Sequence, residues 1–140
     1  MFYKILSLLL ITVAAKGIIL GGYHLYLPTH WQWVAGLHDT PAMLKWALLA
    51  LNDMWSVLMI ILHSSLLFCF IKKNRELFVP LGYLLTSYWF AHAVIISIRP
   101  LPLPEQMQNL SMILTTIPYI QTSILLVATS YFRTKLVLKN

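Results

Sequence analysis

The sequence predicts an all-α membrane protein, in which four transmembrane helices form a single up-down bundle and both chain ends lie in the cytoplasm. The chain has 140 residues, of which 59% are hydrophobic and only 10% are charged, and its mean hydropathy is +0.76. A soluble domain of this size needs far more charge to cover its surface. The four longest apolar runs each reach the roughly 20 residues that cross a bilayer, and the basic residues between them are unevenly distributed.

Polar or proline-containing breaks separate the apolar runs. The predicted spans are approximately residues 5–27, 42–71, 77–98 and 109–132. We expect Pro28 to end the first span and Thr40-Pro41 to begin the second, because proline suits the first turn of a helix. No repeat or soluble domain interrupts the series, so residues 1–140 are expected to form one domain.

The start of the chain also has features of a secretory signal. Lys4 precedes an apolar stretch, and Val13-Ala14-Ala15 is a possible cleavage site. The apolar run continues beyond Lys16, however, which favours a retained first span over a cleaved signal.

Basic residues predict the orientation of the spans. With four spans, one side of the membrane carries Lys4, Lys72, Lys73, Arg75, Arg133, Lys135 and Lys139. The opposite side has Arg99, with Lys45 just inside the second span. Short cytoplasmic loops are enriched in Lys and Arg, so both termini and the middle loop are predicted to be cytoplasmic. The expected location is a bacterial inner membrane.

The outer connections have their own signals. Trp31 and Trp33, in the connection before Pro41, are expected at the level of the lipid headgroups, where amphipathic rings settle. The alternating prolines of residues 99–104 predict a short, stiff, extended turn.

Ionisable and amide side chains inside the spans are the candidate functional residues, because such groups are unfavourable in hydrocarbon. The predicted polar intramembrane cluster, chiefly in the outer half, is Lys16, His24, Asn52, Asp53 and His92. We consider a buried Lys16–Asp53 ion pair, with a structural or a proton-transfer role. His63 lies further inward and is expected to bond to a Ser or Thr of a neighbouring helix.

Gly17 and Gly21 form a small-xxx-small pair on one face of the first span. Such pairs allow two membrane helices to approach closely. We therefore expect this face to contact another helix.

His24 and His92 are also candidate ligands for a metal or haem, since imidazole is a common ligand of both. No HxxxH, CxxCH or Glu-x-x-His spacing supports that interpretation, and a hydrogen-bonded structural histidine is the alternative. Signatures of catalysis, such as GxSxG, paired carboxylates or a glycine-rich phosphate loop, are also missing from the sequence. An enzyme is therefore not predicted, and the cofactor stays open.

A resemblance adds to the expected fold. Residues 21–28, GGYHLYLP, followed by Trp31 and Trp33 and then by LLALN at residues 48–52, loosely resemble small bacterial membrane proteins of the DoxX-like type. The similarity covers only the first two spans. It implies a four-helix bundle and names no substrate.

Three classes of function are compatible with the sequence. The first is a non-catalytic accessory or assembly subunit of a larger membrane complex, because the loops are short and no catalytic motif occurs. The second is a small oligomeric transporter or channel that uses Lys16, Asp53 and His63. The third is an intramembrane haem or metal binder built on His24 and His92. The expected partners are lipid and other membrane subunits or further copies of the chain, and not nucleic acid.

Overall fold

The described part of the chain folds into four long helices. The structure is a computed structural model, and it describes residues 2–30, 37–99 and 108–137. The helices are α1 (Phe2–His30), α3 (Ala42–Ile71), α4 (Arg75–Ile98) and α5 (Gln108–Val137). Each contains a stretch long and apolar enough to cross a membrane. The predicted all-α, multi-pass membrane protein is confirmed at this level.

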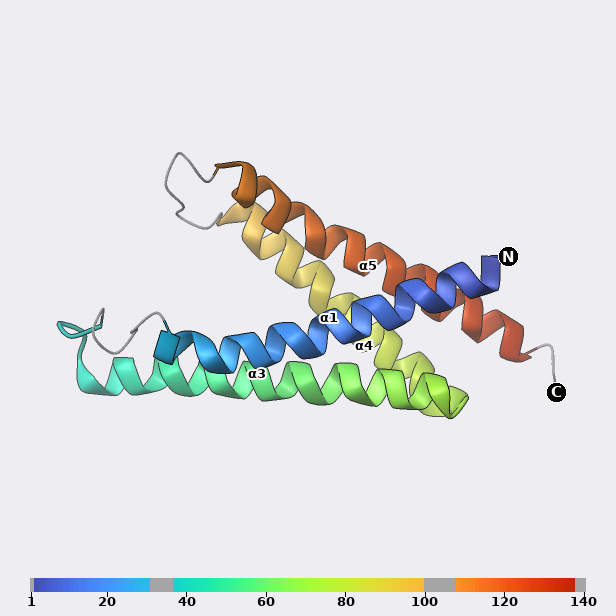
Figure 1. Ribbon diagram of the computed structural model, residues 1–140, viewed down its shortest axis with the longest axis horizontal. Helices are drawn as coiled ribbons and strands as arrows, with labels where there is room; N and C mark the ends of the chain where they lie inside the picture. Colours follow the sequence, from blue (N-terminus) through green and yellow to red (C-terminus); the bar gives the residue numbers. More distant parts are fainter. Residues whose placement is uncertain (1, 31–36, 100–107, 138–140) are drawn as a thin grey trace.

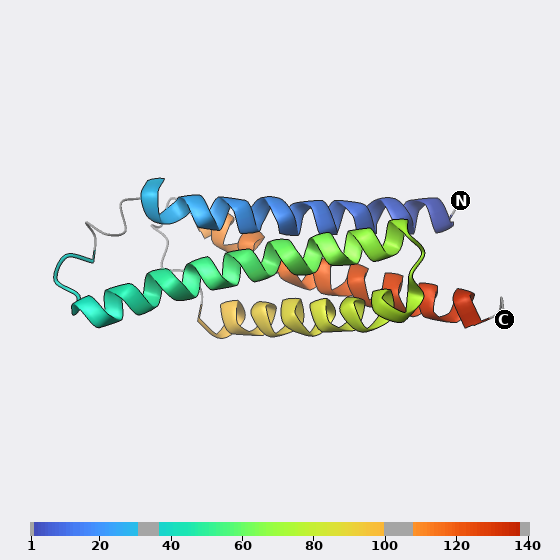
Figure 2. The same cartoon turned by 90° about the horizontal axis from the view of Figure 1, so that it is seen from below.

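The helices associate as two pairs that cross each other. Helix α1 packs along α3, and α4 packs along α5, while contacts between the pairs are fewer. We call the end that holds the α3–α4 turn the inner end. The start of α1 and the last turns of α5 lie at this same end (Figure 1). Toward the opposite, outer end the two pairs diverge (Figure 1). Figure 2 shows the same helices from below, with the α3–α4 turn at the end that holds the N and C labels.

The inner half holds most of the hydrophobic core. Its aromatic centre is formed by Phe70, Phe78 and Phe132, whose ring centroids are 5.2–5.9 Å apart, a favourable spacing for aromatic pairs. Buried aliphatic residues from all four helices surround them, including Leu6, Leu10, Leu66, Leu85 and Leu125. The same side chains therefore hold both helix pairs together at the inner end.

The α3–α4 turn is a Schellman motif that ends at a capping asparagine. The Asn74 N–H donates to the Cys69 carbonyl at 2.9 Å, and the Lys73 N–H donates to the Phe70 carbonyl at 3.1 Å. Lys73 has a φ of 55°, in the left-handed region where glycine is usual. The Asn74 side chain then accepts from the Leu77 N–H at 3.3 Å, which caps α4. Two residues therefore separate one span from the cap of the next.

Glycines lie where the helices of each pair approach most closely. A Cβ on Gly17 would overlap the His63 ring of α3, and one on Gly21 would meet the backbone carbonyl of Ser56. In the second pair, a Cβ on Gly82 would overlap Thr129. Gly22, by contrast, has open space beside it. The Gly17–Gly21 face of α1 thus lies against α3.

Helix α1 is longer than the predicted range 5–27, because it continues through Pro28 to His30. Proline removes only one helical donor and can be accommodated if the freed carbonyl finds another partner. The predictions for Trp31, Trp33 and the proline-rich turn fall mainly on residues 31–36 and 100–107, outside the described residues.

Candidate functional site

Polar side chains inside the helices lie in two groups at different heights. The central group, where the helix pairs cross, consists of Lys16, His63, Trp89 and Gln121, one residue from each helix. The outer group consists of His24, Asn52, Trp55 and His92.

Lys16 joins the first helix to the last. Its Nζ donates to the Oε1 of Gln121 at 2.8 Å and lies 5.7 Å from the centroid of the Trp89 ring. Across the described ranges, the one salt bridge joins His38 and Asp39 in the exposed outer connection. Lys16 is therefore held by an amide oxygen and an aromatic face, without a carboxylate of the described chain at ion-pair distance.

His63 is fully buried, and its two bonded neighbours determine its tautomer. Nδ1 lies 2.8 Å from the Met59 carbonyl, which can only accept, so Nδ1 carries a proton. Nε2 lies 3.1 Å from the Trp89 indole N–H, which can only donate, so Nε2 is unprotonated. His63 is therefore a neutral ring whose nitrogens are both occupied, and its partners are a backbone carbonyl and a tryptophan rather than the predicted Ser or Thr.

The outer group begins with a pair of hydrogen bonds between α1 and α3. The Asn52 side-chain N–H donates to the His24 backbone carbonyl at 2.9 Å. The Asn52 Oδ1 lies 3.4 Å from His24 Nδ1, and because an amide oxygen only accepts, this His24 nitrogen is the donor. One asparagine thus fixes both the backbone and the ring of His24.

Trp55 connects the two histidines of the outer group. Its ring centroid is 4.6 Å from that of His24 and 6.4 Å from that of His92. Tyr88 and Trp89 also contact His92, at centroid distances of 6.2 and 5.5 Å. Aromatic rings from α3 and α4 therefore pack around the candidate ligand pair. Among the described residues, no group of three or more His, Cys, Asp or Glu could hold a metal ion.

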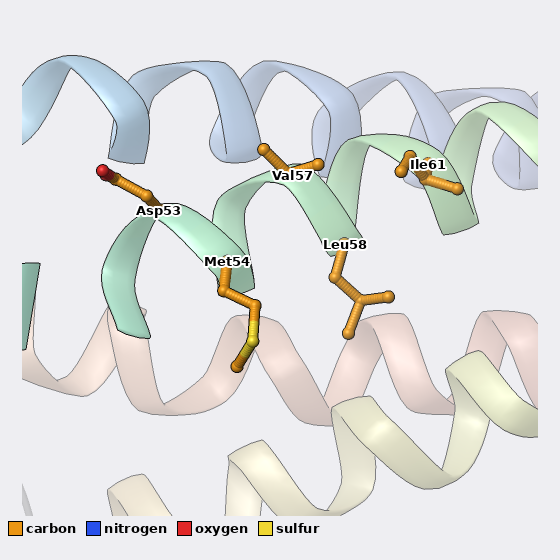
Figure 3. Close-up of a pocket in the computed structure, with 5 residues that line it drawn as sticks. All are labelled: Asp53, Met54, Val57, Leu58 and Ile61. Carbon is orange, nitrogen blue, oxygen red and sulfur yellow. The ribbon is translucent and has the colours of Figure 1, made fainter. Parts of the chain in front are cut away.

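Asp53 lies beside the outer group, on the surface of α3. It is exposed on α3, and its carboxylate accepts a long hydrogen bond of 3.3 Å from its neighbour Asn52. The groove beside it has a volume of about 390 Å³. We call this surface the α3 groove, and its lining residues are Asp53, Met54, Val57, Leu58 and Ile61. Figure 3 shows these side chains on successive turns of one helix, with Asp53 at one end of the row.

The Lys16–Asp53 pair is not formed, and helix register explains why. Gly17 lies against His63, and Asp53 precedes His63 by ten residues. At 1.5 Å per residue this separates Asp53 from the level of Lys16 by about 15 Å. The residues of the proposed transport path, Lys16, Asp53 and His63, accordingly do not share one site.

The predicted cluster is thus divided among the central group, the outer group and the α3 groove. Sequence reasoning also missed three residues that contact its members. Gln121, Trp89 and Trp55 complete the two groups. A mid-span glutamine was the available signal for the central group, because an amide in hydrocarbon needs partners. The two tryptophans gave no such signal, since aromatic residues are common in apolar helices.

Comparisons with known proteins add no family to this description. No protein-family model, curated protein sequence or solved structure matches the chain. The resemblance to DoxX-like proteins therefore stays a prediction.

Proposed function

We propose that the protein is an accessory or assembly subunit of a larger membrane complex, and that it binds its partner through the α3 groove. The observation that carries the proposal is the position of Asp53. A carboxylate within a membrane-spanning helix is normally turned toward the protein interior or paired. Asp53 is instead exposed, beside four apolar side chains.

The α3 groove is shallow and open, and all its lining residues belong to one helix. Each of residues 53, 54, 57, 58 and 61 has another lining residue three or four positions away, the spacing of one helix face. The apolar members are all well exposed, from 46% for Val57 to 63% for Met54. A partner helix in this groove would bury these side chains and remove Asp53 from lipid.

The proposal includes the predicted topology. An up-down bundle with its inner end in the cytoplasm places the basic Lys72–Arg75 turn and both termini on the cytoplasmic side, consistent with the positive-inside rule. The α3 groove then lies toward the outer side of the membrane. A bacterial inner membrane is the proposed location.

Photocrosslinking in the native membrane tests the proposal. A benzophenone amino acid replaces Leu58 in the groove or, as a control, Leu84, which is exposed on α4. We expect a discrete protein adduct from position 58 and none from position 84. Asp53→Asn should abolish the adduct, whereas Glu76→Gln, which removes an exposed carboxylate at the start of α4, should leave it unchanged.

Two results would contradict the proposed function. One is crosslinking of position 58 to lipid alone in membranes that contain the native complement of proteins. The other is an adduct that forms equally well with Asp53→Asn, because the charge would then have no part in recognition.

A further inference from the structure

We infer that the central group is a binding site for one carboxylate group, recognised by Lys16 and Gln121. This inference is independent of the α3 groove, which lies on another face and at another height. It concerns the seam between α1 and α5, which the Lys16–Gln121 hydrogen bond of 2.8 Å crosses.

The first argument is the missing counter-ion. Lys16 is partly buried near the middle of α1, and the described chain offers it an amide oxygen and the face of Trp89. A charged amine in a low-dielectric site is strongly disfavoured unless an anion or several acceptors accompany it. An anion from outside the chain would supply what the central group lacks.

The second argument is an unused donor on Gln121. The residue is only 3% exposed. Lysine only donates, so the Gln121 Oε1 must face Lys16, which fixes the orientation of the amide. The opposite atom, Nε2, is buried without a hydrogen-bond partner among the described residues. A buried unpaired donor is destabilising, because it has given up its bonds to water and gained none in return.

These donors select the chemistry of the ligand. Lys16 Nζ has three hydrogens, of which one is directed to Gln121, and Gln121 Nε2 has two more. A carboxylate has two acceptor oxygens and no hydrogen to donate. It would neutralise Lys16 and pair with the Gln121 amide at once, through charge-assisted hydrogen bonds.

The carboxylate has two possible sources. A long-chain fatty acid can reach this depth through the bilayer. A small acid can arrive from the water outside the bilayer. The shared chemistry is the carboxylate, and the competition experiment distinguishes the two sources.

The full-length protein in nanodiscs is titrated with oleate carrying a ¹³C-labelled carboxyl group. NMR then separates the protein-bound carboxyl from the one dispersed in lipid, with empty nanodiscs as the reference. We expect one saturable site per chain. Methyl oleate, which has the same tail and no charge, should not compete. Competition by acetate would identify a site reached from water, and competition by unlabelled oleate alone would identify one reached from lipid.

Two variants test the donors. Lys16→Met removes the charge and should weaken binding by roughly tenfold or more, as expected for loss of a charge-assisted bond. Gln121→Glu supplies a carboxylate within the chain, so it should exclude oleate while raising the melting temperature. Ser123→Ala, at an exposed position on the same helix, should bind as the wild type does. The Gln121→Glu result keeps the test valid if Lys16→Met does not fold.

The inference is overturned if no saturable carboxylate signal appears. It is also overturned if methyl oleate competes as well as oleate, or if Gln121→Glu binds oleate as tightly as the wild type. Those results would mean that Lys16 needs no external anion. A lysine that is neutral in the membrane would behave in this way.

Discussion

The side-chain amide of Asn52 donates to the backbone carbonyl of His24, at 2.9 Å. This carbonyl lies four residues before Pro28, which has no N–H and so leaves it without its usual helical donor. Asn52 therefore replaces the hydrogen bond that Pro28 removes, and α1 continues to His30. A polar residue of one span thus allows a proline in another.

Asn52→Leu should lower the free energy of unfolding by about 1–3 kcal/mol, because the His24 carbonyl and ring would lose their partner. Pro28→Ala restores the helical donor, so in that background the Asn52→Leu change should be less destabilising. Thermal unfolding in detergent, followed by circular dichroism, measures the double-mutant cycle. Equal effects in the two backgrounds would show that Asn52 does not compensate for Pro28.

Gly17→Ala should destabilise the α1–α3 pair, because the new methyl group would overlap the His63 ring. Gly22→Ala is the matched control. It faces open space five residues further along the same helix, and alanine favours helix by about 1 kcal/mol over glycine. The melting temperature should fall for the first variant and stay equal or rise for the second. A similar fall in the melting temperature of both variants would mean that overlap with His63 is not the cause of the destabilisation.

Trp89→Phe should leave the buried Nε2 of His63 without its donor, and destabilise the protein by about 1–3 kcal/mol. In the wild type, ¹⁵N NMR of the imidazole should show a protonated Nδ1 and an unprotonated Nε2. A spectrum with the opposite tautomer would contradict the bonding of His63 to Met59 and Trp89.

Lys73→Gly should stabilise the α3–α4 turn by up to about 1 kcal/mol, because a side chain in the left-handed region is strained and glycine is not. Lys72→Gly is the control, since Lys72 has a helical φ of −76°, a conformation in which glycine is destabilising. The two melting temperatures should move in opposite directions. A lower melting temperature for Lys73→Gly would show that its lysine side chain contributes more than the strain.

Single cysteines test the predicted topology. Lys72→Cys in the α3–α4 turn should react with an impermeant thiol reagent only from the cytoplasm, and His38→Cys in the outer connection only from the other side. The natural Cys69 is buried and should stay unlabelled in the parent protein. The reverse pattern would show that the basic turn does not face the cytoplasm.

The sequence was sufficient to predict four membrane-crossing helices, because that prediction needs only length, apolarity and breaks. The end of α1 was harder to predict. Pro28 is a stop signal by local rules, and its accommodation depends on Asn52, 24 residues further along the chain. A tertiary hydrogen bond therefore decided a feature that appears local.

The candidate site depended even more on register. The sequence identified Lys16 and Asp53 as charges within the first two spans. Their relative depth in the membrane, however, depends on the register in which α1 packs against α3. Contact between Gly17 and His63 places the two charges at different levels. Side-chain chemistry alone could not reveal this, and neither could it show that Gln121 reaches Lys16 from the other end of the sequence.

The pairing of α1 with α3 and of α4 with α5 has a consequence for biogenesis. Each pair is a helical hairpin of neighbours in sequence, so its contacts can form as soon as its second helix leaves the insertion machinery. The seam between α1 and α5 needs the last helix, since the Lys16 hydrogen bond cannot form before Gln121 is inserted. We expect the first hairpin to be the earliest stable intermediate in the membrane, and the seam to form last.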